Sequence, residues 1–182
     1  MTAILIEQAT ELAVSLQEAK DGLRVDGGDL DTQITLWVRG ITAHAEGYIR
    51  RAIMKQKWQM TLSGFDSTIS LPVTPVLAVS IKYYDEDGAE QELGADQFRF
   101  TRAGVVEPVA SWPVTQSRGD AVTITFDCGF GEDADAVPAD IKLYVIAKLV
   151  EQFDPLTRLE KDTVQASFID SLLDPHRVAW YS

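Results

Sequence analysis

The chain is poor in the residues that build covalent or metal-bound frameworks. Its 182 residues include one cysteine, Cys128, and two histidines, His44 and His176. A single cysteine excludes an internal disulfide and is typical of a reducing compartment. Two histidines so far apart in the sequence match no zinc or first-row metal motif. We therefore expect neither a disulfide framework nor a bound metal, and no cofactor.

Basic residues are also scarce. The chain has 16 Lys and Arg against 28 Asp and Glu, a formal net charge of −12. Duplex DNA is held mainly by Lys and Arg that displace counterions, so this balance argues against a protein that grips nucleic acid. DNA could still pass close by without adhering. No apolar run approaches a membrane span, and no basic segment precedes the short apolar run near the N-terminus, so we expect neither membrane insertion nor export.

Catalytic motifs are missing or incomplete. Residues 129–134, Gly-Phe-Gly-Glu-Asp-Ala, fit the spacing of a dinucleotide-binding turn. Three carboxylates nevertheless lie where phosphates would approach, and Pro138 starts the next helix too late for its N–H groups to face an anion. The acidic loops at 26–31 and 85–88 lack the glycine and glutamate that complete a calcium loop, so turns and helix caps explain them better. No nucleophile motif is present, and the sequence gives no support for an enzyme.

Hydrophobic periodicity is what the chain does have. Ser15 and Glu18 form a capping box that predicts a first helix, and Asp29 or Asp31 is placed to cap a second over Leu30–Ile53. At 100° per residue this second helix shows an apolar core stripe: Leu30, Ile34, Trp37, Val38, Ile41, Ala45, Tyr48, Ile49 and Ala52. A third helix over Pro138–Phe153 is apolar nearly all round, which predicts the buried centre of the helical part. A last helix is expected near 164–173.

A second stripe on the long helix consists of Leu36, Gly40, Ala43 and Gly47. Two glycines inside a helix each cost about 1 kcal/mol relative to alanine, so a compensating contact is expected. Close approach of another backbone would supply it. That backbone could belong to a helix of the same chain or to a neighbouring subunit.

Between the second and third helices the period changes to two. Trp58, Met60 and Leu62 alternate with polar residues, as do Val79, Ile81 and Tyr83, and further strands are expected near 98–100, 105–106 and 122–126. The fold class is therefore α+β: a bundle of about four helices with an antiparallel β region inserted between the second and third. We predict one domain over 1–182, with a helical body (1–54 and 136–175), a β-rich insert (55–130) and a C-terminal tail (176–182).

The tail follows Asp174-Pro175, which stops the preceding helix. It contains aromatic, aliphatic and basic residues of the kinds that dominate protein interfaces: His176, Arg177, Val178, Trp180 and Tyr181. Two interpretations stand: a docking tail that is loose in the free subunit, or a tail that folds back over the β region of its own chain.

Taken in order, several short motifs resemble the head–tail connector proteins of tailed bacteriophages, also called adaptor or head-completion proteins. The first runs from Val14-Ser15-Leu16 through Glu18-Ala19-Lys20 and Leu23-Arg24-Val25-Asp26. The others are Arg51-Ala52-Ile53 with Gln56, Trp58, Leu62 and Gly64-Phe65; Ile69, Leu71-Pro72 and Pro75-Val76; Tyr84 and Gly88; Trp112-Pro113; Gly129-Phe130-Gly131; Val137-Pro138 with Ile141-Lys142; and Leu173, Pro175 and Arg177. The chain departs from the family pattern at His176 and Phe130, where tyrosines are expected.

The resemblance implies a virion protein that is not an enzyme. It would form a homo-oligomeric ring, usually of twelve subunits, below the portal protein of the DNA-filled head. The ring would extend the DNA channel without specific DNA binding and receive the next tail-side connector or stopper protein. The C-terminal residues 176–182 would dock on the portal, and the protein would be made in the cytoplasm of a bacterial host. Prophages and gene transfer agents use related parts. The alternative from a different class is a monomeric cytosolic binding domain or small enzyme with its site in the cleft of the β region.

Overall fold

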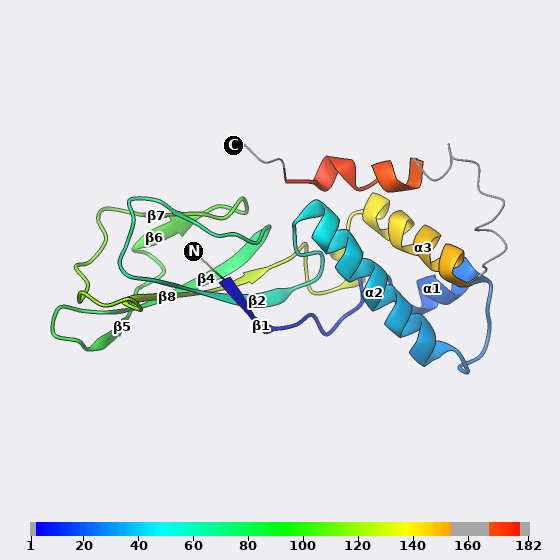
Figure 1. The fold of residues 1–182 in the computed structure, drawn as a ribbon, viewed down its shortest axis with the longest axis horizontal. Coiled ribbons are helices and arrows are strands. Elements are labelled where there is room, and N and C mark those ends of the chain that lie inside the picture. Colours follow the sequence, from blue (N-terminus) through cyan, green and yellow to red (C-terminus); the bar gives the residue numbers. More distant parts are fainter. Residues whose placement is uncertain (1–2, 154–167, 179–182) are drawn as a thin grey trace. The chain divides into compact units, whose positions relative to one another are not determined.

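The computed structural model describes residues 3–153 and 168–178. The chain divides into two compact units (Figure 1). A β unit contains residues 1–9 and 55–129, and a helical unit contains residues 10–54 and 130–182. The chain therefore enters the β unit twice, once at its N-terminus and once between the second and third helices.

The β unit contains two antiparallel sheets. The larger has the order β1 (Ala3–Glu7), β2 (Gln56–Leu62), β8 (Val122–Cys128), β4 (Val76–Tyr84) and β5 (Glu90–Glu92). The smaller has the order β3 (Ile69–Ser70), β7 (Val105–Pro108) and β6 (Phe98–Phe100). The strands from β2 to β7 follow one another through short connections, whereas β1 and β2 are separated by the segment that contains α1 and α2.

The alternating pattern of the strands determines which face of the large sheet is buried. Ile124 on β8 pairs with Met60 on β2 and with Ile81 on β4, and all three side chains are buried. Because side chains alternate between the two faces, this register brings the apolar positions of the three strands together. The strands expected from the period of two are confirmed.

The helical unit contains α1 (Leu16–Leu23), α2 (Asp31–Ile49) and α3 (Ala139–Phe153). It also contains the short 3₁₀ turns η1 (Ala134–Ala136) and η2 (Asp174–His176), and a helical turn at 168–171. α2 packs on α3, where Trp37 meets Phe153 edge to face with ring centroids 6.3 Å apart, and α1 contacts both helices. Among the described residues, no helix has the length and apolar character needed to cross a bilayer.

α1 begins with the predicted cap, whereas α2 does not. The capping box is confirmed, since the Ser15 hydroxyl accepts a hydrogen bond from the Glu18 amide and the Glu18 carboxylate accepts one from the Ser15 amide. The cap expected at Asp29 or Asp31 is wrong. Leu30 occupies the N-cap position, and the Asp31 carboxylate instead pairs with Lys20 at 2.8 Å.

The C-terminal end of α2 lies earlier than its periodicity predicts. The helix stops at Ile49 because Arg50 takes the left-handed conformation, with φ of 58°. Its amide donates to the carbonyl of Glu46, so the left-handed residue satisfies one of the last carbonyls. The core stripe is confirmed at Ile34, Val38 and Ile49, which are fully buried, but Tyr48, predicted to belong to it, is 39% exposed.

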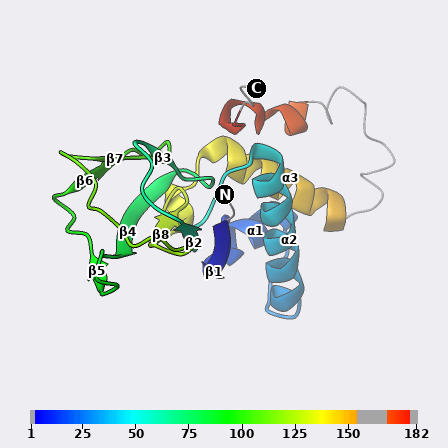
Figure 2. The same ribbon diagram turned by 60° about the vertical axis from the view of Figure 1, so that its left-hand side comes forward.

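The α+β class and the β region between α2 and α3 are confirmed. Two details differ from the sequence prediction. Residues 3–7, assigned to the helical body, form β1 and pair with β2, beside which β1 lies in Figure 2. α3 was predicted to be buried all round, but Leu143 is 47% exposed because only one side of the helix meets the core.

Candidate functional site

The glycine turn at 129–131 joins β8 to the helical unit. Gly129 has φ of 135°, a conformation that favours glycine, and its amide donates to the Pro75 carbonyl. A Cβ on Gly131 would lie 2.3 Å from that of Ala136, so a side chain there would clash. The two glycines thus form a tight turn at the end of β8, as the sequence predicted.

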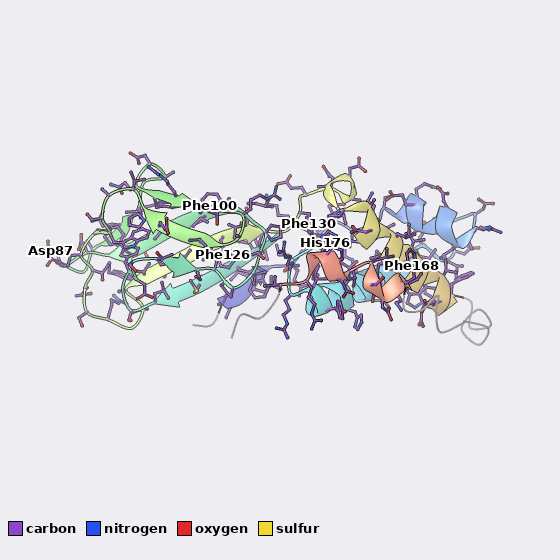
Figure 3. The ribbon with its side chains drawn as sticks, turned by 90° about the horizontal axis from the view of Figure 1, so that it is seen from above. Asp87, Phe100, Phe126, Phe130, Phe168 and His176 are labelled. Atoms are coloured by element: carbon purple, nitrogen blue, oxygen red, sulfur yellow. The ribbon has the colours of Figure 1, made fainter. Side chains whose placement is uncertain are left out.

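The acidic loop at 85–88 is a hydrogen-bonded turn. The Asp85 carboxylate accepts hydrogen bonds from the amides of Asp87 and Ala89 and from the side chain of Gln91. The Gln91 hydrogen bond is the main reason why the pKa of Asp85 lies below its usual value. Figure 3 shows Asp87 at the end of this hairpin. Across the described parts of the chain, no three His, Cys, Asp or Glu side chains converge as metal ligands would.

The start of the C-terminal tail is fastened to the helical unit. The Tyr48 hydroxyl donates to Asp174 at 2.8 Å, and the Arg177 guanidinium lies 5.2 Å from the centre of the Tyr48 ring. The hydrogen bond to Asp174 raises the pKa of Tyr48 above its usual value. One step further on, the Val178 amide donates to the Ile49 carbonyl. The chain is thus held against the C-terminal end of α2 as far as Val178.

His176 forms the second attachment of this segment. Its Nε2 lies 2.7 Å from Asp140 Oδ2 at the start of α3, and its ring meets Phe130 edge to face at 5.8 Å. Figure 3 shows Phe130 and His176 next to one another. These are the two positions at which the chain departs from the connector pattern. The two departures therefore lie in direct contact with each other.

The first three residues of the tail are neither loose nor folded over the β region, the two interpretations that the sequence left open. The contacts of His176, Arg177 and Val178 are instead with α2, α3 and Phe130 of the helical unit. Trp180 and Tyr181, the other two predicted docking residues, lie outside the described part of the chain. The structure therefore brings three of the five candidates together and positions the point from which the last four residues depart.

The small-residue stripe of α2 is a surface of the subunit. Leu36 is 68% exposed, and Gly40, Ala43 and Gly47 are all exposed. A Cβ built on Gly40 or on Gly47 would have no neighbour within 4 Å. A partner helix within the same chain, one of the two explanations offered for the stripe, is therefore absent among the described residues.

A groove of about 740 Å³ borders this stripe. Its walls are Gly40, His44 and Tyr48 on α2, with Tyr144 and Lys148 on α3. Asp170 and Leu173 also line it, so three segments distant in the chain form the groove together, and no local pattern predicts it. The charged groups of the groove are paired with one another: Lys148 Nζ lies 2.7 Å from Asp170 Oδ1 and 3.7 Å from Glu151 Oε2.

The β unit has a smaller hollow of about 310 Å³, lined by Tyr83, Leu93 and Trp112 among others. Phe65 stacks on Trp112 with ring centroids 4.6 Å apart. The buried Nε1 of Trp112 has no hydrogen-bond acceptor within the described residues. This hollow corresponds to the cleft that a small-molecule site in the β region would use.

Several solved structures share the fold of this chain. No family model and no curated protein matches the chain. Among solved structures, the fold is that of a protein from the neck of phage-like particles. It matches a chain in the neck of an empty gene transfer agent particle computed with C6 symmetry, with a TM-score of 0.78 and 21% identity over 100% of this chain and 98% of that chain.

Two further structures agree at the same coverage. One is the virion of a native gene transfer agent particle, with a TM-score of 0.77 and 21% identity. The other is the neck of a native gene transfer agent particle computed with C12 symmetry, with a TM-score of 0.73 and 22% identity. The resemblance to head–tail connectors inferred from the sequence is thus confirmed at the level of the fold.

Proposed function

We propose that this chain is a structural protein of the neck of a phage-like particle, where it forms a ring between the portal and the tail and extends the DNA channel. The observation that carries the proposal is the match of the whole fold, over 100% of this chain, to chains of gene transfer agent necks and virions. Similarity limited to one unit could reflect a supersecondary motif that unrelated proteins share. The similarity found here extends over both units, so a shared motif does not explain it.

The exposed stripe of α2 supports a ring. Glycines in a helix weaken it unless another backbone approaches closely, and no part of the described chain approaches Gly40 or Gly47. On this proposal a neighbouring subunit supplies that contact. Leu36, Gly40, Ala43 and Gly47 are accordingly the proposed subunit interface.

The fastened C-terminal segment supports docking on the portal. His176 and Arg177 anchor the tail to the helical unit, and the chain leaves this anchor at Val178. Trp180 and Tyr181 are two and three residues beyond Val178, which is at most about 10 Å of extended chain at 3.3 Å per residue. Short tails that carry aromatic residues from a rigid base lose little entropy when they bind. We assign the portal contact to these residues, with the base supplied by 176–178.

The charge of the chain is compatible with a DNA channel. A net charge of −12 repels the phosphate backbone, so DNA would slide past the ring rather than bind to it. On this proposal the protein has no catalytic role, and its other partner is the next connector or stopper protein on the tail side.

A second candidate function rests on the hollow of the β unit. Its volume of about 310 Å³ and its aromatic lining, which includes Tyr83 and Trp112, would suit a small ligand. This candidate predicts a monomer whose Trp112 fluorescence responds to a ligand, and it predicts no attachment to a portal.

The deciding experiment is electron microscopy of particles from a host that carries the gene, together with affinity purification of the tagged protein. The proposal expects the tag at the head–tail junction and the portal protein in the purified material. A protein that is absent from purified particles and elutes as a monomer without portal would refute it. In that case a thermal-shift screen for ligands would test the second candidate.

A further inference from the structure

β1, the dark blue strand of Figure 1, forms one edge of the large sheet. It pairs with β2 on one side, and no other strand of the described chain lies along its outer side. In an antiparallel ladder, an edge strand directs the N–H and C=O groups of alternate residues away from the sheet. The outer edge of β1 therefore offers these groups to another extended backbone.

The exposed side chains of β1 are mostly aliphatic. Ile4 is 55% exposed, Leu5 is 39% exposed and Ile6 is 43% exposed. Natural edge strands are usually protected against pairing by charged side chains, especially lysine, or by proline. Residues 3–6 include none of these, and Glu7 at the end of the strand pairs with Lys57 at 3.0 Å. This edge is therefore apolar and unprotected.

The register shows that the aliphatic side chains lie on both faces of the sheet. Leu5 is opposite Trp58, two residues from the buried Met60, and so lies on the core face. Ile4 is opposite Gln59 and lies on the other face. A helix or a flat surface that packed on one face would leave the aliphatic group on the other face in water. A strand beside β1, at the usual spacing of about 4.8 Å, would cover part of both.

The opposite edge of the sheet has a different character. Glu90, Gln91 and Glu92 of β5 are all exposed, which is typical of a protected edge. If β5 of a second copy paired with β1, two carboxylates would lie against a strand that has no basic residue. Pairing of two β1 strands would give a two-fold dimer, which does not extend into a ring. The best match for β1 is therefore a strand from a different chain.

A bulge in β1 limits the length of the available edge. The register shifts between Leu5 and Glu7, so the regular stretch is residues 3–5. The bulge lies next to the ion pair between Glu7 and Lys57, so the irregular end of the strand is also its charged end. A matching segment is therefore short, has apolar side chains opposite residues 3–5 and has no acidic residue beside Glu7, because like charges on adjacent strands repel.

We propose that β1 accepts a short extended segment of a different neck protein as an additional strand of the large sheet. Main-chain hydrogen bonds supply the affinity, and contacts of aliphatic or aromatic side chains with Ile4 and Leu5 supply the specificity. The inference rests on the proposed function, because the neck provides the neighbouring proteins. It adds a docking edge in the β unit to the surfaces already assigned to the helical unit.

Photocross-linking in the particle identifies what lies beside this edge. The photoreactive residue benzoylphenylalanine replaces Ile4 in the full-length protein, and the control variant carries it at Val114, which is 65% exposed in the β unit. Both variants are produced in the host that assembles the particles. Purified particles are irradiated, and the cross-linked peptides are identified by mass spectrometry.

The proposal expects an adduct between position 4 and an apolar segment of a different neck protein, and no adduct between position 114 and that segment. An adduct that joins two copies of this chain at position 4 would overturn the inference. It would also be overturned if particles that contain the variant gave no adduct from position 4.

A blocking substitution supplies a second readout. Ile4→Lys adds the kind of charge that protects natural edge strands, and Val114→Lys is the matched control. Both variants should melt with the parent, because both positions are exposed. In particles, Ile4→Lys should lower the ratio of the cross-linked partner to portal protein at least about tenfold, whereas Val114→Lys should leave it unchanged. Unchanged partner content with Ile4→Lys would overturn the inference and leave the proposed function intact. Absence of the parent protein from purified particles would instead refute the proposed function, and the inference with it.

Discussion

The glycines of α2 offer the most direct test of whether its outer face is free within the subunit. Gly47→Ala adds a methyl group that would have no neighbour within 4 Å, so it introduces no strain. Alanine is the better helix former by about 0.5–1 kcal/mol. For a chain of this size, a gain of 1 kcal/mol corresponds to roughly 2–4 °C in Tm. We therefore expect Gly47→Ala to melt about 1–4 °C higher than the parent.

Gly22→Ala is the matched control on α1. The propensity gain is the same, but the new Cβ would lie 2.8 Å from Ile146 Cγ2, and a β-branched side chain cannot easily move aside. Overpacking of this kind typically costs about 1–3 kcal/mol. We expect the Tm of Gly22→Ala to stay level or fall, so that it lies below that of Gly47→Ala.

Both variants are measured by circular dichroism at 222 nm, which follows the helical unit. Gly47→Leu is then examined for assembly by light scattering and negative-stain microscopy. It should keep the fold and lose the ring, because a leucine would occupy the space that a neighbouring subunit is proposed to fill. A lower Tm for Gly47→Ala would mean that the chain itself covers the stripe, and normal rings from Gly47→Leu would remove the stripe from the interface.

Four further outcomes are expected. Truncation after Val178 should leave the Tm unchanged and abolish portal attachment. Removal of 176–182 should abolish attachment and also lower the Tm, because the contacts of His176 and Arg177 are lost. Normal binding of the protein truncated after Val178 to purified heads would contradict the docking role. Ser15→Ala should cost about 1 kcal/mol of unfolding free energy at pH 7. The pKa of Glu18 is lowered, chiefly by its hydrogen bond with Lys142. Its contribution to the free energy of unfolding is therefore fully present above the usual pKa near 4.5 and is lost as the pH falls through the lower pKa of the folded state. Urea titrations of Glu18→Gln and the parent should therefore converge in acid, and a difference that persists at pH 2 would refute this. Finally, the isolated protein should give no gel shift with duplex DNA at physiological salt, and a salt-sensitive shift at micromolar protein would reveal a basic patch.

The sequence by itself determined the elements that depend on local chemistry. The capping box at Ser15 and Glu18 acts over one helical turn, so it could be read directly and is found in the structure. The same holds for the alternating strands and for the glycine turn after β8, because a strand exposes alternate residues whatever it packs against. The order of these elements was enough to predict the α+β class.

The tertiary structure decided which faces are covered. The periodicity of α2 marked two stripes, but only the packing showed that Leu36, Gly40, Ala43 and Gly47 meet nothing within the described chain. In the same way, the apolar residues around α3 predicted complete burial, yet one side is open. Burial depends on neighbours that come from distant segments, and a helical pattern carries no information about how many of them arrive.

The attachment of the tail was likewise beyond the reach of sequence. Asp174, His176 and Val178 are held by Tyr48, Asp140 and Ile49, partners that lie between 36 and 129 positions away in the chain. The placement of β1 beside β2 has the same origin, since it joins residues 3–7 to residues 57–60. Local propensity identifies the segments, but contacts between distant segments form only when the whole fold brings them together, and those contacts define the surfaces through which this protein would work.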